Sequence, residues 1–130
     1  MEISDREMEI LKAYSSLWQN GIDCNPRINE RSDEAYINGN DPLDYTRMRE
    51  DEQKALYDWI CDAFDFRETS TVCLDTSYGL KHVYERQTGN YVSNGEFKGA
   101  MIHVGYLPVD PLDLNCCYLV RLYEDEEGEG

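Results

Sequence analysis

Two capping boxes constrain most strongly how this chain can fold. Ser4 with Glu7, and Ser93 with Glu96, each place a hydroxyl and a carboxylate three residues apart. In such a pair the hydroxyl accepts a hydrogen bond from the third helical N–H, and the carboxylate accepts one from the N–H of the cap residue. The sequence therefore predicts one helix that begins near residue 5 and another that begins near residue 94.

Apolar spacing and helix-breaking residues set the expected extent of these two helices. After the first box, apolar residues recur at helical spacing as far as Trp18, and Gly21 is the expected stop. After the second box they recur as far as Val104, Gly105 suits the helix exit, and Pro108 forbids continuation. We therefore expect each helix to bury one face.

Two further helices and one strand are expected in the rest of the chain. An apolar face that includes Met48 and Trp59 predicts a helix over residues 45–64. Another helix is expected from residue 76 or 77 to Gly89, with Tyr78 among the residues that pack it on the last helix. Alternating side chains predict a strand over residues 115–123, with its partner within 70–74 or 20–43.

These elements predict a single α+β domain, mainly helical, with about four helices and a small C-terminal β element. We expect this domain to span residues 1–123, with an acidic helical part over 1–66 and a helix-turn-helix-like part over 77–123. Residues 20–43 are rich in Asn, Asp, Gly and Pro, and are expected to hold a short strand or to form a binding loop. Residues 124–130 are expected to be a disordered acidic tail.

The charge of the chain is strongly negative and unevenly distributed. It has 27 acidic against 12 basic residues, a formal net charge of −15. Residues 1–76 sum to −10, residues 77–109 to +1, and residues 110–130 to −6. Such a protein repels nucleic-acid phosphates and anionic membranes, and attracts basic protein surfaces. Solubility is the ordinary explanation, and a protein that occupies a basic groove is the more specific one.

Five aspartates in and beside the predicted 45–64 helix give this acidity a pattern. They fall on one flank at about 100° per residue and extend along roughly 30 Å of helix. Such a row can imitate the phosphates of a nucleic-acid strand, although charged rows are usually solvated flanks. The candidate partner-binding residues are Asp44, Asp51, Asp58, Asp62 and Asp65, with Glu124, Asp125, Glu126 and Glu127 of the tail adding long-range attraction.

The order of elements over residues 77–105 supports a second hypothesis, a helix-turn-helix unit that binds DNA. The helix that would enter the major groove carries one lysine, Lys98, opposed by Glu96. A helical hairpin packed into the core explains the same sequence. If this half binds a partner, the residues expected to face it are Lys81, His82 and Lys98.

Residues able to perform catalysis or bind metal are few and scattered. His82 and His103 are the only histidines, and no Cys-x-x-Cys spacing occurs. No local spacing supports a metal site or a Cys–His nucleophile, so we expect no enzyme, no metal and no cofactor. The cysteines are odd in number and unlike a disulfide framework, which predicts reduced thiols in a cytoplasmic protein. They are Cys24, Cys61, Cys73, Cys116 and Cys117.

Four short segments in the C-terminal half form a recognisable motif. They are TSYGLKH at 76–82, YVSNGEFKGAM at 91–101, GY at 105–106 and DLN at 113–115. This motif resembles one in small uncharacterised proteins of bacterial phages and mobile elements. The resemblance supplies no mechanism, but it implies the setting in which inhibitors of host defence, including anti-CRISPR proteins, are found.

Acidity, the aspartate row and this setting together predict a non-enzymatic inhibitor from a phage or mobile element. We expect it to bind a basic nucleic-acid-binding surface of a host defence protein, most plausibly a CRISPR effector nuclease, in the cytoplasm of a bacterial host cell. No direct contact with nucleic acid and no membrane association are expected. The alternative is a helix-turn-helix-type DNA-binding regulator of a mobile element.

Overall fold

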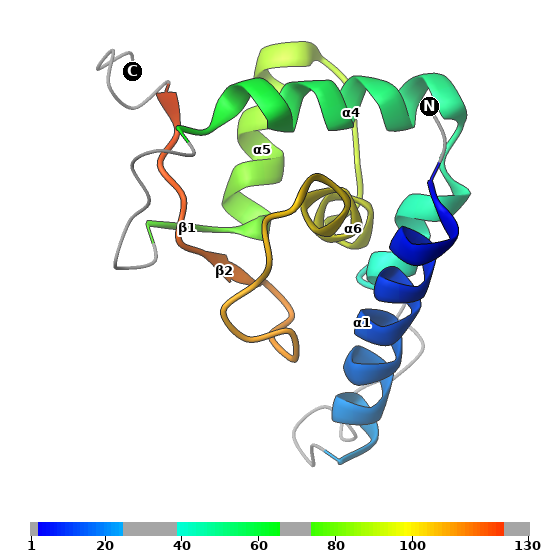
Figure 1. Cartoon of the computed structure of the whole chain (residues 1–130). Helices are drawn as coiled ribbons and strands as arrows, with labels where there is room; N and C mark the ends of the chain where they lie inside the picture. The colour runs from blue at the N-terminus through cyan, green and yellow to red at the C-terminus, as the bar shows by residue number, and fades with distance from the viewer. Residues whose placement is uncertain (1–2, 25–38, 66–73, 124–130) are drawn as a thin grey trace.

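Helix α6 (Asn94–Val104) lies at the centre of the fold and is seen end-on in Figure 1. Helix α4 (Glu50–Ala63) crosses above it, with α5 (Ser77–Thr88) on one side and α1 (Asp5–Cys24) on the other. The 3-10 helix η1 (Pro42–Arg47) packs directly on α6, and two short strands, β1 (Asp75–Thr76) and β2 (Cys117–Tyr118), form a small antiparallel sheet. The computed structural model describes residues 3–24, 39–65 and 74–123, which form a mainly helical α+β fold as predicted.

The capping residues determine where the helices begin. Ser4 and Glu7 exchange the two hydrogen bonds of a capping box, at 2.9 and 3.1 Å, and α1 follows directly. Ser93 and Glu96 do the same at the start of α6. These starts are confirmed, whereas the predicted stop at Gly21 is wrong because α1 continues to Cys24.

The exits of the two C-terminal helices also follow the prediction. Gly89 ends α5 with a φ of 78°, a left-handed conformation that glycine adopts without the Cβ penalty. Gly105 ends α6 with a φ of 125°. Both glycines lie at the helix ends that the sequence predicts.

The predicted helix over residues 45–64 is instead two elements with a break between them. Pro42 begins the 3-10 helix η1, and the Asp41 carboxylate accepts a hydrogen bond from the N–H of Leu43 at 2.9 Å. Met48 and Arg49 then adopt extended backbone angles, so α4 can begin only at Glu50. The acidic first turn of α4 suits the positive end of the helix dipole.

The C-terminal strand is much shorter than predicted. Tyr118 pairs with Asp75 and Cys117 with Thr76, and an isolated bridge joins Phe64 to Leu122. The partner strand therefore lies just outside the 70–74 segment that was expected to supply it. Because the sheet is so small, the segment is also held by hydrogen bonds outside the ladder, such as that from the Ser77 N–H to the Cys116 carbonyl oxygen, and by the burial of Tyr118 and Leu122.

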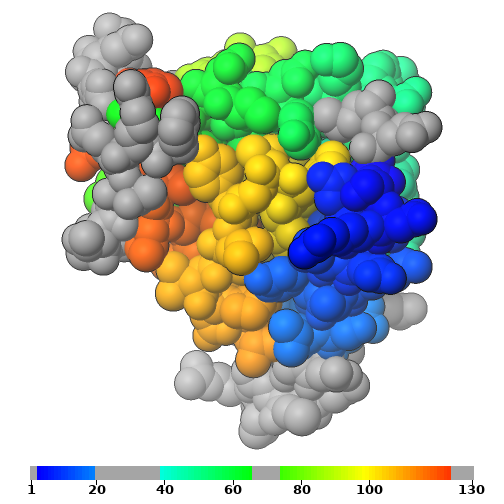
Figure 2. Space-filling model, in the orientation of Figure 1, coloured from blue at the N-terminus to red at the C-terminus, as the bar shows by residue number. Residues whose placement is uncertain are grey.

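Helix α6 is buried because other elements cover it on several sides. Eight of its eleven residues are buried. At Gly99 a Cβ atom would lie 2.2 Å from the carbonyl oxygen of Pro42, so the glycine permits the close approach of η1. On the face shown in Figure 2, α1 lies against the end of α6 and the segment that follows it. One hydrophobic cluster joins residues of both halves, from Leu11 to Leu122.

Two features expected from the sequence, the disordered tail and the 20–43 binding loop or strand, are not tested by the described residues. The tail at 124–130 and most of the 20–43 connection lie outside the described residues. Within the described part of the chain, no helix is both long and apolar enough to cross a membrane.

Candidate functional site

The five-aspartate row is divided by the break before α4. Asp44 lies in η1, is partly buried and pairs with Arg47 at 2.8 Å; burial, with the charge of Asp41 adding to it, raises the pKa of its carboxyl group. Asp65 lies beyond the end of α4 and is only 4% exposed. The prediction that one helix flank carries all five is therefore wrong.

Three aspartates remain on one exposed flank of α4, which we call the α4 acidic face: Asp51, Asp58 and Asp62. At 1.5 Å per residue they extend along about 17 Å, little more than half the length expected from the sequence. Arg49 lies 2.9 Å from Asp51 and Lys54 lies 2.7 Å from Asp58, and all four side chains are exposed. Solvent screens such pairs, so the cations reduce the acidic field of this face without cancelling it.

The tail candidates, residues 124–127, lie outside the described residues. Their contribution to partner binding stays a prediction from charge alone.

The helix-turn-helix order is present, but its second helix is the central helix of the core. Helices α5 and α6 cross at a large angle in Figure 1, as in a helix-turn-helix unit. A helix that enters the major groove must present an exposed face with cations. Lys98, the only cation within α6 apart from His103, is 2% exposed. The expectation that Lys98 faces a partner is therefore wrong, and this geometry gives no support to DNA binding through α6.

Lys98 serves instead as a buried link between elements. Its Nζ donates a hydrogen bond to the carbonyl oxygen of Leu114 at 3.1 Å and lies 4.3 Å from the centroid of the Trp18 ring. Burial lowers the pKa of its amino group, while nearby acidic groups, Cys116 and Asp41 foremost, oppose that shift. The side chain thus ties α6 to α1 and to the segment before β2.

The C-terminal motif gathers around an open pocket of about 430 Å³, which we call the motif pocket. Helix α5 contributes three of its lining residues, and the turn and first residue of α6 contribute three more. The others come from the segments before η1 and before β2. The lining residues are Gly39, Asn40, Tyr78, Lys81, His82, Tyr91, Ser93, Asn94, Leu114 and Asn115.

An ion-pair cluster forms one wall of this pocket. The Lys81 Nζ donates to Glu85 at 2.9 Å and to the carbonyl oxygen of Val92 at 3.1 Å, and it lies 4.9 Å from the centroid of the Tyr91 ring. His82 Nδ1 lies 3.3 Å from the other oxygen of Glu85. Burial would raise the pKa of Glu85, but the hydrogen bonds from Lys81 and from the Val92 N–H outweigh it and the pKa is lowered.

An amide cluster also lines the pocket. The Asn94 Nδ2 group lies 2.8 Å from the carbonyl oxygen of Leu114 and 3.1 Å from the Oδ1 atoms of both Asn40 and Asn115, so it donates into a ring of acceptors. Asn94 is only 7% exposed, and its Oδ1 has no hydrogen-bond partner among the described residues. A buried amide oxygen without a donor is unusual, because leaving it unpaired costs about 1–3 kcal/mol.

Two exposed aromatic residues stand beside the pocket. Tyr91 is 77% exposed and Tyr78 is 52% exposed, the latter edge-on to His82 with centroids 4.4 Å apart. The prediction that Tyr78 packs α5 on α6 is therefore wrong, whereas Leu80 and Tyr84 of the same helix are buried. Lys81 and His82, two of the residues expected to face a partner, both line the pocket, but the pocket itself was not predicted. The signal that could have found it was the excess of Tyr, Asn and His in the motif.

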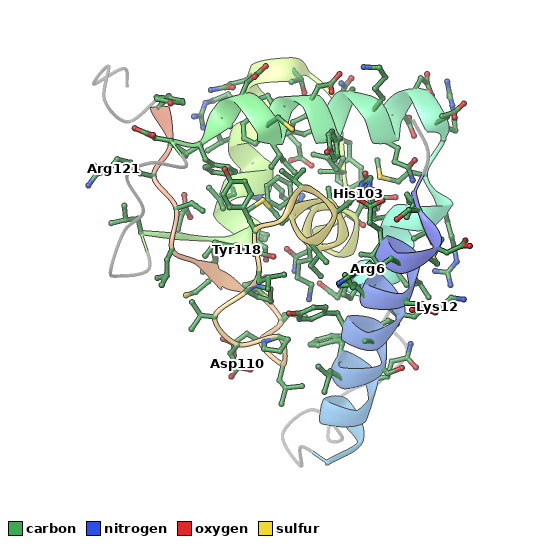
Figure 3. The ribbon with its side chains drawn as sticks, viewed as in Figure 1. Arg6, Lys12, His103, Asp110, Tyr118 and Arg121 are labelled. Carbon is green, nitrogen blue, oxygen red and sulfur yellow. The ribbon has the colours of Figure 1, made fainter. Side chains whose placement is uncertain are left out.

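The second histidine belongs to a separate chain of polar groups that leads from the core to the surface at Glu7. In Figure 3, His103 points from α6 toward α1, where its Nε2 lies 3.2 Å from a Glu7 oxygen. Its Nδ1 lies 2.7 Å from the Tyr45 hydroxyl. Since the carboxylate only accepts, the Nε2–H of His103 donates to it, and Nδ1 shares a second hydrogen bond with the Tyr45 hydroxyl. Burial raises the pKa of Tyr45, so this hydroxyl stays protonated.

The cysteines depart from one expectation. Cys61 and Cys116 are free, the first exposed and the second buried, with burial raising the pKa of Cys116 to about 11. Cys117 is disulfide-bonded, so the prediction that all five thiols are reduced is wrong. Within residues 3–24, 39–65 and 74–123, no group of three or more His, Cys, Asp or Glu side chains is placed to hold a metal ion.

Comparison of the chain with protein-family models, with curated proteins and with solved structures finds no match.

Proposed function

We propose that this chain is a non-enzymatic binding protein that docks on a basic surface of another protein. The observation that carries the proposal is the α4 acidic face, Asp51, Asp58 and Asp62, on a chain with a net charge of −15. All three carboxylates are exposed and share one flank, so a partner can approach them without unfolding any element. Their spacing along about 17 Å suits a row of basic side chains that normally contacts a few phosphates.

The setting follows from the motif. Because the motif resembles one from phage and mobile-element proteins, we extend the proposal to an inhibitor of a host defence protein, with a CRISPR effector nuclease as the partner. The carboxylates would occupy the groove that receives nucleic acid. Long-range attraction between opposite charges would speed association, and the effect would weaken with salt because the Debye length is about 8 Å at physiological ionic strength.

This setting places the protein in the cytoplasm of a bacterial host, where disulfides are rare. The disulfide at Cys117 favours an oxidising environment and therefore counts against that placement. Alkylation of intact host cells followed by mass measurement determines whether Cys117 is reduced there. A Cys117 that is alkylated in cells fits the cytoplasmic proposal, and one that is protected until reductant is added contradicts it.

The test compares two variants that remove the same charge. One changes Asp51, Asp58 and Asp62 to Asn, and its control changes Asp5 and Asp110 to Asn and Glu9 to Gln, three exposed acids outside α4. Affinity for purified CRISPR effector nucleases, and inhibition of their cleavage, is measured from low to high salt. Exposed ion pairs are worth about 0.2–1 kcal/mol each, so we expect the α4 variant to lose about tenfold in affinity.

The comparison separates docking from general attraction. A larger loss and a shallower salt dependence for the α4 variant support docking through that face. An equal loss for both variants contradicts α4 docking and leaves only non-specific attraction. If the unmodified protein neither binds nor inhibits any of the nucleases at low salt, the proposed partner class is wrong.

A further inference from the structure

No Asp or Glu lines the motif pocket directly, although Glu85 pairs with two of its lining residues, Lys81 and His82. None of its ten lining residues is Asp or Glu, while the chain as a whole has 27 of them. Two lining residues, Lys81 and His82, are basic. Lys81 is only 6% exposed, so the expectation that it openly faces a partner is wrong, whereas His82 is exposed. A ligand with a negative group would meet Lys81 and His82 here and would compete with Glu85 for them.

The two tyrosines indicate what else such a ligand contains. Tyr91 exposes 77% of its surface and Tyr78 exposes 52%, so most of one ring and half of the other contact solvent beside the pocket. Lys81 lies against Tyr91 and His82 against Tyr78, which holds both rings at the pocket wall. Exposed aromatic faces held in this way stack on planar rings, and each stacked base contributes about 1–3 kcal/mol.

The amide cluster supplies hydrogen-bonding groups for the edge of a planar ring. The buried Asn94 Oδ1 has no donor among the described residues, and Asn40 and Asn115 lie beside it in the same wall. Side-chain amides present both donors and acceptors, as the edges of nucleobases do. Because this oxygen has almost no accessible surface, a ring N–H or amino group would pair with it only after the Asn94 side chain turns toward the pocket.

We propose that the motif pocket binds a mononucleotide. The base stacks on Tyr91 with its edge toward Asn94 and Asn115, and the phosphate lies at Lys81 and His82. Tyr91 also borders a neighbouring hollow lined by Asp51 and Glu52, whose carboxylates repel a phosphate and so direct it to the Lys81 side. A polynucleotide is disfavoured, because its affinity depends on many phosphate contacts and the net charge of −15 repels them.

The test is titration calorimetry of the full chain with AMP, GMP, CMP and UMP at low salt, together with three comparison probes. The probes are adenosine, inorganic phosphate and a ten-residue oligothymidylate. We expect at least one mononucleotide to bind at least tenfold more tightly than either adenosine or phosphate. No binding of any mononucleotide up to 5 mM overturns the proposal, and so does phosphate that binds as tightly as the best nucleotide. An oligothymidylate that binds more tightly than every mononucleotide overturns the choice of ligand.

Variants locate the site. Tyr91→Ala removes a mostly exposed ring and leaves the core intact, and we expect it to weaken binding of the best nucleotide at least fivefold. His82→Ala is expected to weaken the nucleotide more than it weakens the matching nucleoside. Tyr123→Ala, at an exposed tyrosine outside the pocket, is the matched control and should leave affinity unchanged. Equal affinity in Tyr91→Ala and the unmodified protein, with circular dichroism unchanged, overturns the proposal.

This inference is independent of the proposed docking through α4. The Asp51, Asp58 and Asp62 variant is expected to bind the nucleotide at least as well as the unmodified protein does, because it removes repulsive charge beside Tyr91. Loss of nucleotide binding in that variant contradicts the placement of the phosphate. Failure of the docking experiment leaves the pocket experiment unaffected.

Discussion

Replacing Gly99 with Ala tests whether the close contact between α6 and η1 determines the packing of the core. The added Cβ would lie 2.2 Å from the Pro42 carbonyl oxygen and 2.5 Å from the Tyr45 Cβ, where ordinary contacts are 3.4–4 Å. The two elements must therefore separate by about 1 Å, because these atoms cannot rotate away as the end of a flexible side chain can.

The expected size follows from two opposing effects. Overpacking of this kind costs about 3 kcal/mol at the upper end of its usual range. Alanine in a helix interior recovers about 1 kcal/mol relative to glycine. We therefore expect Gly99→Ala to lower the free energy of unfolding by about 2 kcal/mol, and the midpoint of thermal unfolding by about 8 °C for a chain of this size.

Urea and thermal unfolding followed by circular dichroism measure both quantities. Gly79→Ala is the matched control, since the three atoms nearest to its Cβ all belong to the Asp75 side chain, which can shift at the cost of its hydrogen bond from the Thr76 N–H. The control is expected to stay within about 1 kcal/mol of the unmodified protein, given the compensating gain in helix propensity. If Gly99→Ala is as stable as the unmodified protein, helix propensity dominates and the argument from close packing is refuted.

Three further predictions concern Lys98, a helix cap and the thiols. Burial lowers the pKa of Lys98 in the folded state, whereas in the unfolded chain it is about 10.4. At a pH between these two values, Lys98 is protonated in the unfolded chain and neutral in the folded one. Across that window, the free energy of unfolding of the unmodified protein should therefore rise with pH relative to that of Lys98→Met. If urea unfolding gives a difference between the two proteins that does not change with pH, this prediction is contradicted. Ser93→Ala removes a cap hydrogen bond and should cost about 1 kcal/mol in the same assay, whereas no loss would show that the box does not stabilise α6. In native protein at pH 8, iodoacetamide should modify exposed Cys61, while buried Cys116, with its pKa raised to about 11, should react only after unfolding. Equal rates measured by mass spectrometry contradict the burial of Cys116.

The sequence by itself determined where three of the helices begin and where two of them end. Ser4, Ser93 and Thr76 satisfy the first N–H groups of α1, α6 and α5, and Gly89 and Gly105 provide the exits of the last two. These are contacts within a few residues, so their energy depends little on the rest of the fold. The mainly helical class follows from the same local signals together with apolar spacing.

The break before α4 is where local signals were misinterpreted. Apolar spacing continues through residues 45–64 as if for one helix, but Asp41 and Pro42 start a separate 3-10 helix. That turn lies against the buried Gly99 side of α6, so its geometry depends on a residue more than fifty positions away. Because the helix is interrupted there, the row of aspartates on one flank is shorter than predicted.

Only the tertiary structure decided which charged and aromatic side chains are exposed. Lys98 is buried and Tyr78 exposed, the reverse of what residue type indicates, because α6 became the central helix and α5 an outer one. The motif pocket depends in the same way on chain segments before η1 and before β2 meeting at the start of α6. A side chain is buried when other elements of the fold cover it. The spacing of residues along one helix shows which of them share a face, but not which elements cover that face.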